Sequence, residues 1–503
     1  MATWNRRRFL QTVCGGLAAT VVGARTIGGE TAPRGPNIVV FTVDDMDITS
    51  VNCYGNPLPN LTPNMDRLAS EGMRFEHAHV SAAVCMPCRQ SYMTGLHSHH
   101  NGSFGFVEVE PGAFPSLSEL LMEHGYYAGS IGKGRDYQAF PWDGFIGGLG
   151  GQGWYNRKPE GFYREAKAMI HEAREAGKPF YLGINTSDPH RPFVGSQQEE
   201  EHVKRVREQY PHAPDFPEME PVCSEDEVPL LPYLPDLPAI RKETVQYLTA
   251  VKRGDDALGQ IMDLIDEEGL TDETLFVFFS DHAASMPTAK QNCYRHSSAI
   301  PLIVRWPGKV EPGTVDDTHM VSTLDFMSTF LELLDIPIPE PQDGRSMLPL
   351  WRGERQSDRD FVMTTHNYIW PGVQVFPMRA VHTKDWSYVF NPWSDGLNRR
   401  EHTENQSGLT MDAIRDAAVT DEAMRERLNY ILLRRRNEMF DLTVDPYSFD
   451  NLAEEEAYQS KMEEMQALLA KEMERTNDTL LPYLVEKTGY PEEWNILDED
   501  RIS

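Results

Sequence analysis

The stretch NIVVFTVDD, residues 37–45, determines the predicted fold class of this 503-residue chain. From Ile38 to Val43 every residue is apolar or β-branched, and there is no alternation of apolar and charged positions. This pattern is typical of a strand that is buried on both faces, as in a parallel sheet covered by helices. The run ends in Asp44 and Asp45. The stretch therefore predicts an α/β protein with two acidic side chains at a strand end.

Three further apolar runs repeat this pattern, and each is followed by polar residues. They are 126–131 before Gly132-Lys133, 180–184 before Asp188-Pro189-His190, and 275–279 before Asp281-His282. Helical signals lie between the runs: Thr62-Pro63 with Gly72 as the stop, Ser116 and Glu119 with Gly125 as the stop, and the stripe Leu258, Ile261, Met262 and Ile265. Strands alternating with helices predict a large, mostly parallel sheet sandwiched by helices, with functional residues at the carboxyl ends of its strands.

Composition narrows the classes of function. The chain has 47 Lys and Arg against 77 Asp and Glu, for a net charge of -30, which disfavours general binding of nucleic acids. An anionic substrate would therefore need a local basic pocket. The 40% hydrophobic content is enough for a large core. The six cysteines show no paired spacing beyond one C-x-x-C and do not form a disulfide framework.

The N-terminal segment has the features of an export signal. The sequence from Arg6 to Leu10 reads RRRFL and precedes an apolar stretch at 12–22 that is too short to span a bilayer. It resembles a twin-arginine signal, although a basic start followed by a chance apolar run would look similar. We expect residues 1–35 to be signal and linker and the mature protein to be periplasmic or secreted, with no membrane span.

The remaining chain divides into two expected domains. Residues 36–345 are predicted to form the catalytic α/β domain, and 346–503 a smaller α+β subdomain. Within the first, 195–237 is rich in Pro and acidic residues and is predicted to be a surface excursion near the site. Within the second, 379–390 reads as short strands, and Tyr458, Met462, Met465 and Leu469 mark a final amphipathic helix.

The segment CMPCRQSYMTG, residues 85–95, carries the sharpest chemical signal. Pro87 suits a first helical turn and Gly95 a helix end, so Cys85 is expected at a helix N-terminus, where an anion is favoured. Arg89 would point into the same region. A redox pair or half of a zinc site with Cys88, and a buried structural cysteine, are the alternative interpretations.

This C-x-P-x-R pattern followed by T-G resembles the signature of the formylglycine-dependent sulfatases, members of the alkaline phosphatase superfamily. Other landmarks of the family are present in the expected order along the chain. These landmarks are Asp44-Asp45, Gly132-Lys133, Asp188-Pro189-His190, Asp281-His282, Lys290, the segment 300–308, and Met439-Phe440-Asp441-Leu442 with Asp445-Pro446 and Asn451-Leu452. The resemblance runs from about residue 37 to 453. The resemblance implies an alkaline phosphatase-like α/β fold.

The resemblance also implies a metal site. Asp44, Asp45, Asp281 and His282 would hold one divalent cation together with an oxygen of the modified Cys85. Carboxylate oxygens suit Ca²⁺, the ion expected first, or Mg²⁺. His282 departs from the Asn of many relatives, and its imidazole suits Mn²⁺ or Zn²⁺ better than Ca²⁺.

The resemblance assigns catalytic roles as well. A separate maturation enzyme would oxidise Cys85 to formylglycine, whose hydrated aldehyde is the nucleophile. Arg89 would orient this group, while Lys133, His190 and Lys290 would bind the sulfate oxygens. His190 or Lys290 would protonate the leaving group as general acid.

A second departure from the family is Arg135, where many relatives have a histidine. Arginine does not shuttle protons near neutral pH, so either another residue takes that task or Arg135 serves substrate binding. His100, Arg295 and His296 are further candidates for substrate binding, with His97 and His99 in the same histidine cluster. The alternative for these histidines is a surface or structural role.

Together these features predict an exported, metal-dependent hydrolase of sulfate esters or sulfamates. The DPHRPF (188–193) and NCYRH (292–296) segments look most like the branch of heparan N-sulfatases and iduronate 2-sulfatases, which implies a sulfated glycan or its saccharide units as substrate. The alternatives are a phosphonate monoester or phosphodiester hydrolase of the same superfamily and a non-catalytic glycan-binding protein on the same fold.

Overall fold

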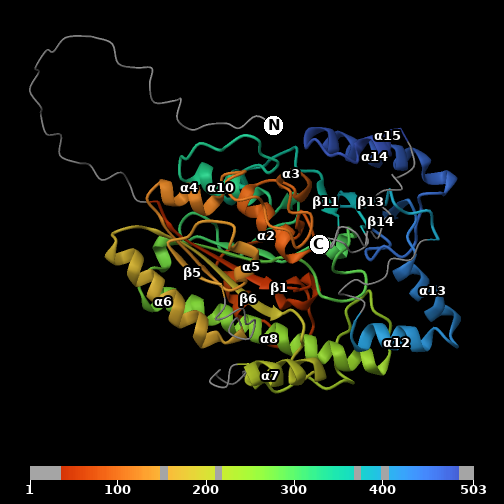
Figure 1. Cartoon of the computed structure of the whole chain (residues 1–503), viewed down its shortest axis with the longest axis horizontal. Coiled ribbons are helices and arrows are strands. Elements are labelled where there is room, and N and C mark those ends of the chain that lie inside the picture. The colour runs from red at the N-terminus through yellow and green to blue at the C-terminus, as the bar shows by residue number, and fades with distance from the viewer. Residues whose placement is uncertain (1–34, 148–156, 210–217, 368–374, 398–406, 487–503) are drawn as a thin grey trace, which may run out of the picture. The chain divides into compact units, whose positions relative to one another are not determined.

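The computed structural model describes residues 35–147, 157–209, 218–367, 375–397 and 407–486 (Figure 1). Of the predicted export signal and linker at 1–35, residues 1–34 lie outside these described residues. From Pro36 onward the described residues form one compact unit. No helix among them is long and apolar enough to cross a membrane.

A mixed, mostly parallel sheet of eight strands forms the centre of this unit, in the order β5-β4-β6-β1-β7-β8-β2-β9. The neighbours from β5 to β7 are parallel, whereas β8 runs antiparallel to both β7 and β2. The strands are β1 (Asn37–Asp44), β2 (Met73–Phe75), β4 (Tyr127–Ile131), β5 (Gly144–Ile146), β6 (Phe180–Pro189), β7 (Thr274–Ser280), β8 (Leu302–Arg305) and β9 (Thr314–Asp316). The four predicted strands and the predicted fold class are confirmed.

Strand β1 is buried along its whole length because both faces of the sheet are covered. Val39, Phe41 and Val43 pack in the core with helices α1, α6 and α8. Ile38 and Val40 pack in the opposite core with α2, α4 and α10, and Figure 1 shows the two helical layers. These helices are α1 (Pro63–Ser70), α2 (Cys85–Thr94), α4 (Leu117–Glu123), α6 (Pro159–Glu175), α8 (Pro238–Glu267) and α10 (Asp325–Leu333).

Most of the predicted helix boundaries are confirmed. The Ser116 hydroxyl accepts from the backbone N–H of Glu119 at 3.2 Å, which caps α4. Gly95 ends α2 with a φ of 68°, in the left-handed region. At α1, however, the Thr62 hydroxyl accepts from the backbone N–H of Asn52 at 2.8 Å and does not cap the helix. Gly72 allows a close approach, since a Cβ there would lie 2.4 Å from the carbonyl oxygen of Val304.

Short elements complete the first part of the fold. The predicted surface excursion contains the helix α7 over part of its length, and 210–217 lies outside the described residues. The short elements are β3 (Ala78–His79), which pairs with β10 (Val321–Ser322), α3 (Ser98–Asn101), α5 (Gly134–Tyr137), α7 (Gln197–Gln209), α9 (Arg295–Ser298) and α11 (Leu348–Trp351).

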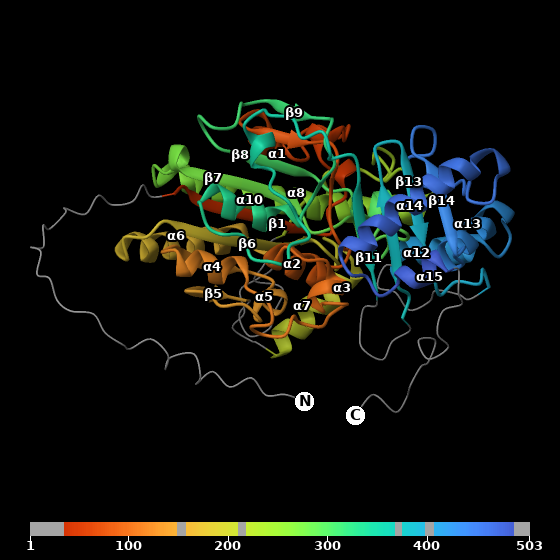
Figure 2. The ribbon, with the colours of Figure 1, turned by 90° about the horizontal axis from the view of Figure 1, so that it is seen from above.

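The C-terminal elements build a second, antiparallel sheet of four strands in the order β11-β12-β13-β14. Figures 1 and 2 both place it at one end of the large sheet. Met462, Met465 and Leu469 of the predicted amphipathic helix pack against it, which confirms that helix, although Tyr458 precedes it and a further helix follows it. The elements are β11 (Val362–His366), β12 (Met378–His382), β13 (Trp386–Phe390), α12 (Leu409–Ala417), α13 (Glu422–Leu432), β14 (Asn437–Asp441), α14 (Gln459–Arg475) and α15 (Leu481–Val485).

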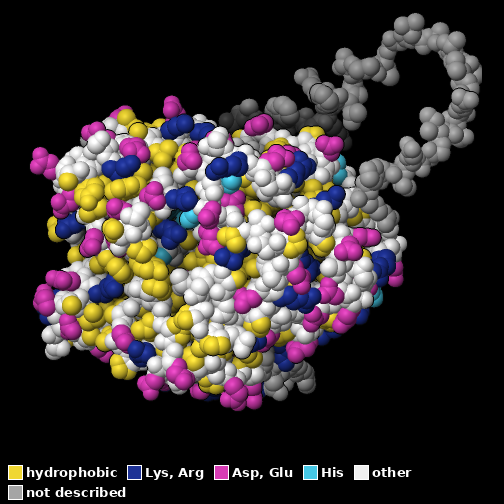
Figure 3. Space-filling view, turned by 180° about the vertical axis from the view of Figure 1, so that it is seen from behind, with side chains coloured by type: hydrophobic (Ala, Val, Ile, Leu, Met, Phe, Trp, Pro, Cys, Tyr) yellow, Lys and Arg dark blue, Asp and Glu magenta, His cyan; other side chains and the backbone are white. Residues whose placement is uncertain are grey.

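The surface reflects the excess of acidic residues. Figure 3 shows one face on which acidic side chains are spread along most of the outline, with small groups of hydrophobic side chains between them. This distribution agrees with the net charge of -30. Cationic groups near a bound anion must therefore come from specific positions in the fold.

Candidate active site

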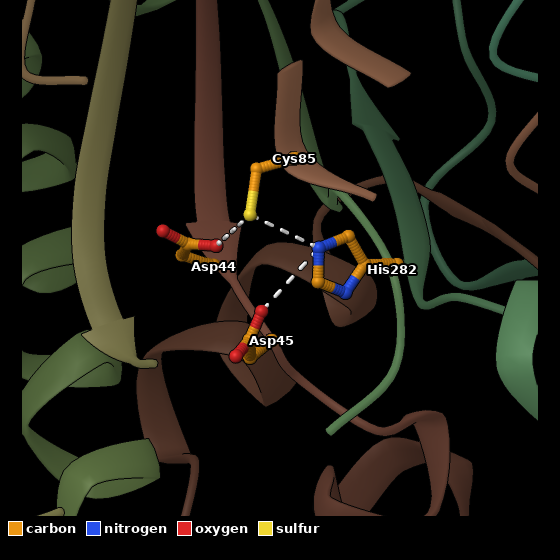
Figure 4. A group of neighbouring side chains, drawn as sticks. All are labelled: Asp44, Asp45, Cys85 and His282. Atoms are coloured by element: carbon orange, nitrogen blue, oxygen red, sulfur yellow. Dashed lines mark hydrogen bonds and ion pairs between the residues drawn. The ribbon is translucent and has the colours of Figure 1, made fainter. Parts of the chain in front are cut away.

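Four buried side chains from three segments converge beyond the carboxyl end of β1. Figure 4 shows Asp44, Asp45, Cys85 and His282 pointing toward one another. Their potential ligand atoms all lie within 4.8 Å of one another. The sheet creates this convergence because β1 and β7 are parallel neighbours, so that Asp44-Asp45 and His282 emerge at the same edge.

The distances within the cluster are short. The Sγ of Cys85 lies 3.5 Å from Oδ1 of Asp44 and 3.3 Å from Nε2 of His282. The same Nε2 lies 3.3 Å from Oδ1 of Asp45. Cys85 is the first residue of α2, as predicted, so the positive end of the helix faces the cluster.

The orientation of His282 is fixed by its second ring nitrogen. Nδ1 lies 2.9 Å from the carbonyl oxygen of Ala283, so it carries the proton and donates to that oxygen. Nε2 then has a free lone pair that faces the two carboxylates. Such a hydrogen bond to the distal nitrogen is typical of histidines that bind metals.

Asp281 lies at the edge of the cluster and connects it to Arg89. Its Oδ1 accepts from the backbone N–H of Asp45 at 3.1 Å and lies 3.7 Å from Nε2 of His282. Its Oδ2 is held by the Arg89 guanidinium. The predicted role of Asp281 as a metal ligand stays a prediction.

Arg89 is fully buried and contacts three segments. Its Nη1 donates to Oδ1 of Asn185 at 2.9 Å and to the Tyr137 hydroxyl at 3.1 Å. Burial alone would lower the pKa of Arg89, but the charge of Asp281 outweighs it and raises the pKa. Sequence reasoning missed Asn185 and Tyr137, although Asn185 directly follows the predicted strand run at 180–184.

Two lysines neutralise the acidic pair. Lys133 forms an ion pair with Oδ2 of Asp44, and Lys290 lies 3.0 and 3.1 Å from the two carboxylate oxygens of Asp45. Burial would raise the pKa of Asp44, but Lys133 and His190 hold it well below its usual range. The structure thus brings both predicted lysines to the cluster.

The Cys85 thiol is unsuited to thiolate chemistry in this setting. Burial raises its pKa well above the usual value, and the neighbouring charge of Asp44 raises it further. The side chain therefore stays protonated near neutral pH. An unmodified Cys85 would be a poor nucleophile here.

His190 lies at the open side of the cluster, with 23% of its side chain exposed. Its Nε2 is 3.9 Å from Oδ2 of Asp45. Its Nδ1 is 2.5 Å from the carbonyl oxygen of Arg191 and donates to it. The predicted residue is therefore at the site, with Nε2 directed at it.

The histidines around α3 contact the C-terminal part of the chain. The His97 and His99 rings stack with centroids 5.3 Å apart, and Nε2 of His99 is 3.1 Å from the Thr476 hydroxyl. His100 places Nδ1 3.1 Å from Oδ2 of Asp343. These contacts favour the structural alternative for the three histidines, and the substrate-binding role of His100 stays a prediction.

The other candidates for substrate binding are also placed. His296 is buried and stacks on Tyr233 at 4.9 Å, and burial lowers its pKa to about 3. Burial also lowers the pKa of the neighbouring Arg295. Arg135 is exposed, with its guanidinium 5.2 Å from the Phe106 ring centroid. Their predicted roles remain predictions.

Two family models match the chain. The model described as Sulfatase matches residues 36–336, more than half of the chain. The chain belongs to the sulfatase family. The model described as N-sulphoglucosamine sulphohydrolase, C-terminal, matches residues 288–394 of this sulfatase. The resemblance predicted from the Cys85 signature is confirmed, and the chain is a hydrolase of this family.

Curated relatives align with this sulfatase over most of its length. Human N-sulphoglucosamine sulphohydrolase is 26% identical over 492 residues, covering 92% of this chain and 93% of the relative. An ulvan-active sulfatase of Formosa agariphila is 25% identical over 450 residues, with coverages of 86% and 78%. The alignments thus include both the large sheet and the C-terminal sheet.

Solved structures share the fold of this sulfatase. A protein in complex with its substrate D-glucosamine-2-N,6-O-disulfate has a TM-score of 0.64 at 19% identity, covering 89% of this chain and 99% of that chain. A 2-O GAG sulfatase also has a TM-score of 0.64 at 19% identity, with coverages of 92% and 96%. At these identities the likeness establishes the fold.

Proposed function

We propose that this sulfatase hydrolyses sulfate ester or sulfamate groups on a sulfated glycan or its saccharide units. The observation that carries the proposal is the buried cluster of Asp44, Asp45, Cys85 and His282 with Lys133 and Lys290 against it. It combines a position for a nucleophile, donor atoms for a cation, and cationic groups for the anionic sulfate group. The net charge of -30 makes such a local cationic set necessary for an anionic substrate.

The donor set fits one divalent cation. Asp44, Asp45, Asp281 and His282 would hold it together with the modified residue 85, and Ca²⁺ is the ion we expect first, with Mg²⁺ or Mn²⁺ as alternatives. The fit rests on buried donors within 4.8 Å and on the Nε2 lone pair of His282 facing the carboxylates. When bound, the cation would lower the pKa of the attacking hydroxyl.

Residue 85 would supply the nucleophile after a maturation enzyme has converted the thiol to formylglycine. Burial raises the pKa of the unmodified thiol, which argues against the Cys85 thiolate itself as the nucleophile in the folded site. The N-terminal end of α2 and Arg89 orient residue 85. Lys133 and Lys290 would bind sulfate oxygens and stabilise the charge of the transferring group.

His190 is the proton donor that we propose for the leaving group. Its Nδ1–H is engaged with the Arg191 carbonyl, so Nε2 is the nitrogen directed at the site. In the imidazolium form, Nε2–H would give its proton to the departing sugar oxygen or nitrogen as the bond to sulfur breaks. Lys290 is fully buried between the oxygens of Asp45 and is less accessible to a leaving group.

Relatives support a glycan substrate. Human N-sulphoglucosamine sulphohydrolase aligns with 92% of this chain, and the C-terminal model of that name matches residues 288–394. The solved structure with a bound glucosamine disulfate has the same fold. The RRRFL sequence from Arg6 to Leu10 supports export to the periplasm or beyond, where such glycans are met.

Mass spectrometry and a product assay together test the proposal. The peptide that contains residue 85 would be analysed, with an aldehyde-trapping reagent, from protein isolated from its natural source. Sulfate release would then be measured on glucosamine N-sulfate, glucosamine 6-sulfate and a sulfated uronate, with Cys85→Ala as the matched control. A formylglycine mass and sulfate release that is lost in Cys85→Ala are the expected results.

Other outcomes distinguish the alternatives. An unmodified thiol with no sulfate release would overturn the proposed nucleophile. Turnover of a phosphodiester or phosphonate monoester in preference to every sulfate would indicate the other hydrolase class of the superfamily. Tight glycan binding without turnover, retained in Cys85→Ala, would indicate a non-catalytic glycan-binding protein.

A further inference from the structure

Asp188, which follows the predicted strand run in β6, is held between two buried arginines. Arg253 of α8 places Nε 2.7 Å from Oδ2 and Nη2 2.9 Å from Oδ1 of this carboxylate. Arg157, just before α6, forms an ion pair with Oδ1 through Nη1. Neither arginine side chain is more than 4% exposed. The carboxylate is therefore fixed by two segments that are far apart in sequence.

Arg157 also reaches the backbone that carries His190. Its Nη2 donates to the carbonyl oxygen of His190 at 2.8 Å and to that of Arg191 at 3.3 Å. The Arg191 oxygen is the same atom that accepts from Nδ1 of His190. One guanidinium thus contacts both the chain of the histidine and the acceptor that orients its ring.

This arrangement has a consequence for the imidazole. The Arg191 carbonyl determines that Nδ1 of His190 carries a proton, which leaves Nε2 to face Asp45. If that carbonyl moves, the ring loses the hydrogen bond at Nδ1, which helps to fix its rotation and its tautomer. The planar fork of arginine can bind a carboxylate and a carbonyl at once, and a lysine cannot reproduce this geometry.

We propose that Arg157, anchored by Asp188, is a positioning residue that holds His190 in the orientation for protonating the leaving group. The inference rests on the proposed function, since it assigns Arg157 to the proton-transfer step of the same site. Arg157 itself touches neither the cluster residues nor, by this assignment, the substrate. Its effect passes through the two carbonyl oxygens.

The test compares leaving groups in Arg157→Gln, Arg157→Lys and wild type. Sugar sulfates need a proton at the departing oxygen, whereas a nitrophenyl sulfate leaves well without one. We expect Arg157→Gln to lower kcat about 100-fold on the sugar sulfate and less than about 5-fold on the nitrophenyl sulfate. Arg157→Lys is expected to show the same selectivity while keeping the ion pair with Asp188. Arg174→Gln, an exposed position of α6 paired with Glu268, is the control and is expected to behave as wild type.

A double-mutant cycle links the effect to the histidine. His190→Ala is expected to show the same selectivity for leaving groups, and adding Arg157→Gln to it is expected to cause no further loss. Equal losses on both substrates in the Arg157 variants, or additive losses in the double variant, would overturn the proposal. Wild-type release of sulfate from the sugar sulfate shows that the proposed function holds. Turnover of the nitrophenyl sulfate alone would show sulfatase activity without that substrate class, so a failure of the proposed function is recognised separately.

The tautomer of His190 can be measured without substrate, so the role of Arg157 can be tested even if no substrate is turned over. Nitrogen NMR of labelled wild-type protein is expected to show His190 protonated at Nδ1 in its neutral form. Arg157→Lys and Arg157→Gln are expected to give a mixture of tautomers with the fold retained by circular dichroism. An unchanged tautomer in folded Arg157→Lys would show that Arg157 does not orient the ring.

Discussion

Arg89 and Asp281 form a fully buried ion pair in which two nitrogens of the guanidinium meet one carboxylate oxygen. Nε lies 3.0 Å and Nη2 2.9 Å from Oδ2. Arg89 belongs to the helix that begins with Cys85, and Asp281 precedes His282 after β7. The pair thus ties the position of residue 85 to that of His282. A buried pair of this kind adds little net stability, but it fixes the geometry on which the site depends.

Replacing Arg89 with lysine should therefore weaken the link between residue 85 and His282. Lysine keeps the charge but cannot contact Asp281, Asn185 and Tyr137 together. We expect kcat/KM to fall by at least about 100-fold, because misplacing reacting groups is costly, and urea unfolding to show a loss of about 2–4 kcal/mol.

Arg67→Lys is the matched control for this prediction. Its side chain is 36% exposed and pairs with acidic groups on the surface, so we expect a change within about 1 kcal/mol and unaltered activity. Equal losses in the two variants would contradict the link between the Arg89 pair and the site.

The sequence predicts the parts of the site that follow from strand ends. Asp44, Lys133 and His282 each come after an apolar run, and parallel strands bring such ends to one edge. The helix over 85–94 is likewise visible in the sequence, because Pro87 and Gly95 mark its boundaries. Local patterns are sufficient here since the sheet supplies the long-range contacts.

The supporting residues could not be predicted in the same way. Arg157 and Arg253 contact Asp188 from distant positions, and nothing in their local sequence distinguishes them from surface arginines. The histidines of α3 show the opposite problem, because His99 looks like a site residue but packs against Thr476. The roles of the two arginines and of the α3 histidines depend on side-chain contacts between segments that only the folded chain brings together.

Removing the proposed cation should destabilise the protein as well as inactivate it. Asp44, Asp45 and His282 offer buried donor atoms within 4.8 Å of one another, and a cation that binds them only in the folded chain would stabilise that state. We expect a chelator to abolish activity and to lower Tm, and a saturating ion to restore about 2–3 kcal/mol of stability at 100 times its Kd. Thermal unfolding with Ca²⁺, Mg²⁺ or Mn²⁺ added back measures the preference.

His282→Asn refines the metal prediction. An amide oxygen in place of the imidazole nitrogen should weaken Mn²⁺ more than Ca²⁺, since nitrogen donors favour Mn²⁺ over Ca²⁺. Titration of each ion into the chelator-treated variant, followed by Tm, gives the two affinities. Unchanged affinity for both ions would show that Nε2 of His282 is not a ligand.

Gly408 lies against the ion pair that holds Arg191, so we expect a larger residue at this position to disturb the neighbouring His190. A Cβ at this position would lie 2.4 Å from Oε1 of Glu243 and 2.5 Å from Nη1 of Arg191, and these two groups form a buried ion pair at 2.6 Å. We expect Gly408→Ala to displace Arg191 and to lower kcat about 10-fold, because the carbonyl of Arg191 orients His190.

Gly353→Ala controls for backbone strain in this experiment. Gly353 also has a positive φ, at 76°, but a Cβ at this position would have no neighbouring atom within 4 Å. We expect a loss of about 1–2 kcal/mol from strain alone and an unchanged kcat. A similar fall in kcat for both variants would rule out the connection through Arg191.

Asp255 should make the stability of the protein depend on pH. This carboxylate of α8 accepts hydrogen bonds from the backbone N–H groups of Asn64 at 3.1 Å and Met65 at 2.9 Å, at the start of α1. Burial nevertheless raises its pKa from 3.8 to about 7. Between these values the unfolded chain releases the proton and the folded chain retains it, so the free energy of unfolding falls as pH rises and levels off above the folded pKa.

Asp255→Asn removes this titration, and the amide oxygen can still accept from α1. We expect the free energy of unfolding of the variant minus that of wild type to increase by about 1 kcal/mol per pH unit between pH 5 and 7, because only wild type loses stability as pH rises. Urea unfolding measures both free energies. Asp263→Asn, on the same helix but with 56% of its side chain exposed, should leave the pH dependence unchanged. Parallel curves for Asp255→Asn and wild type would mean that the hydrogen bonds from α1 keep Asp255 ionised in spite of its burial.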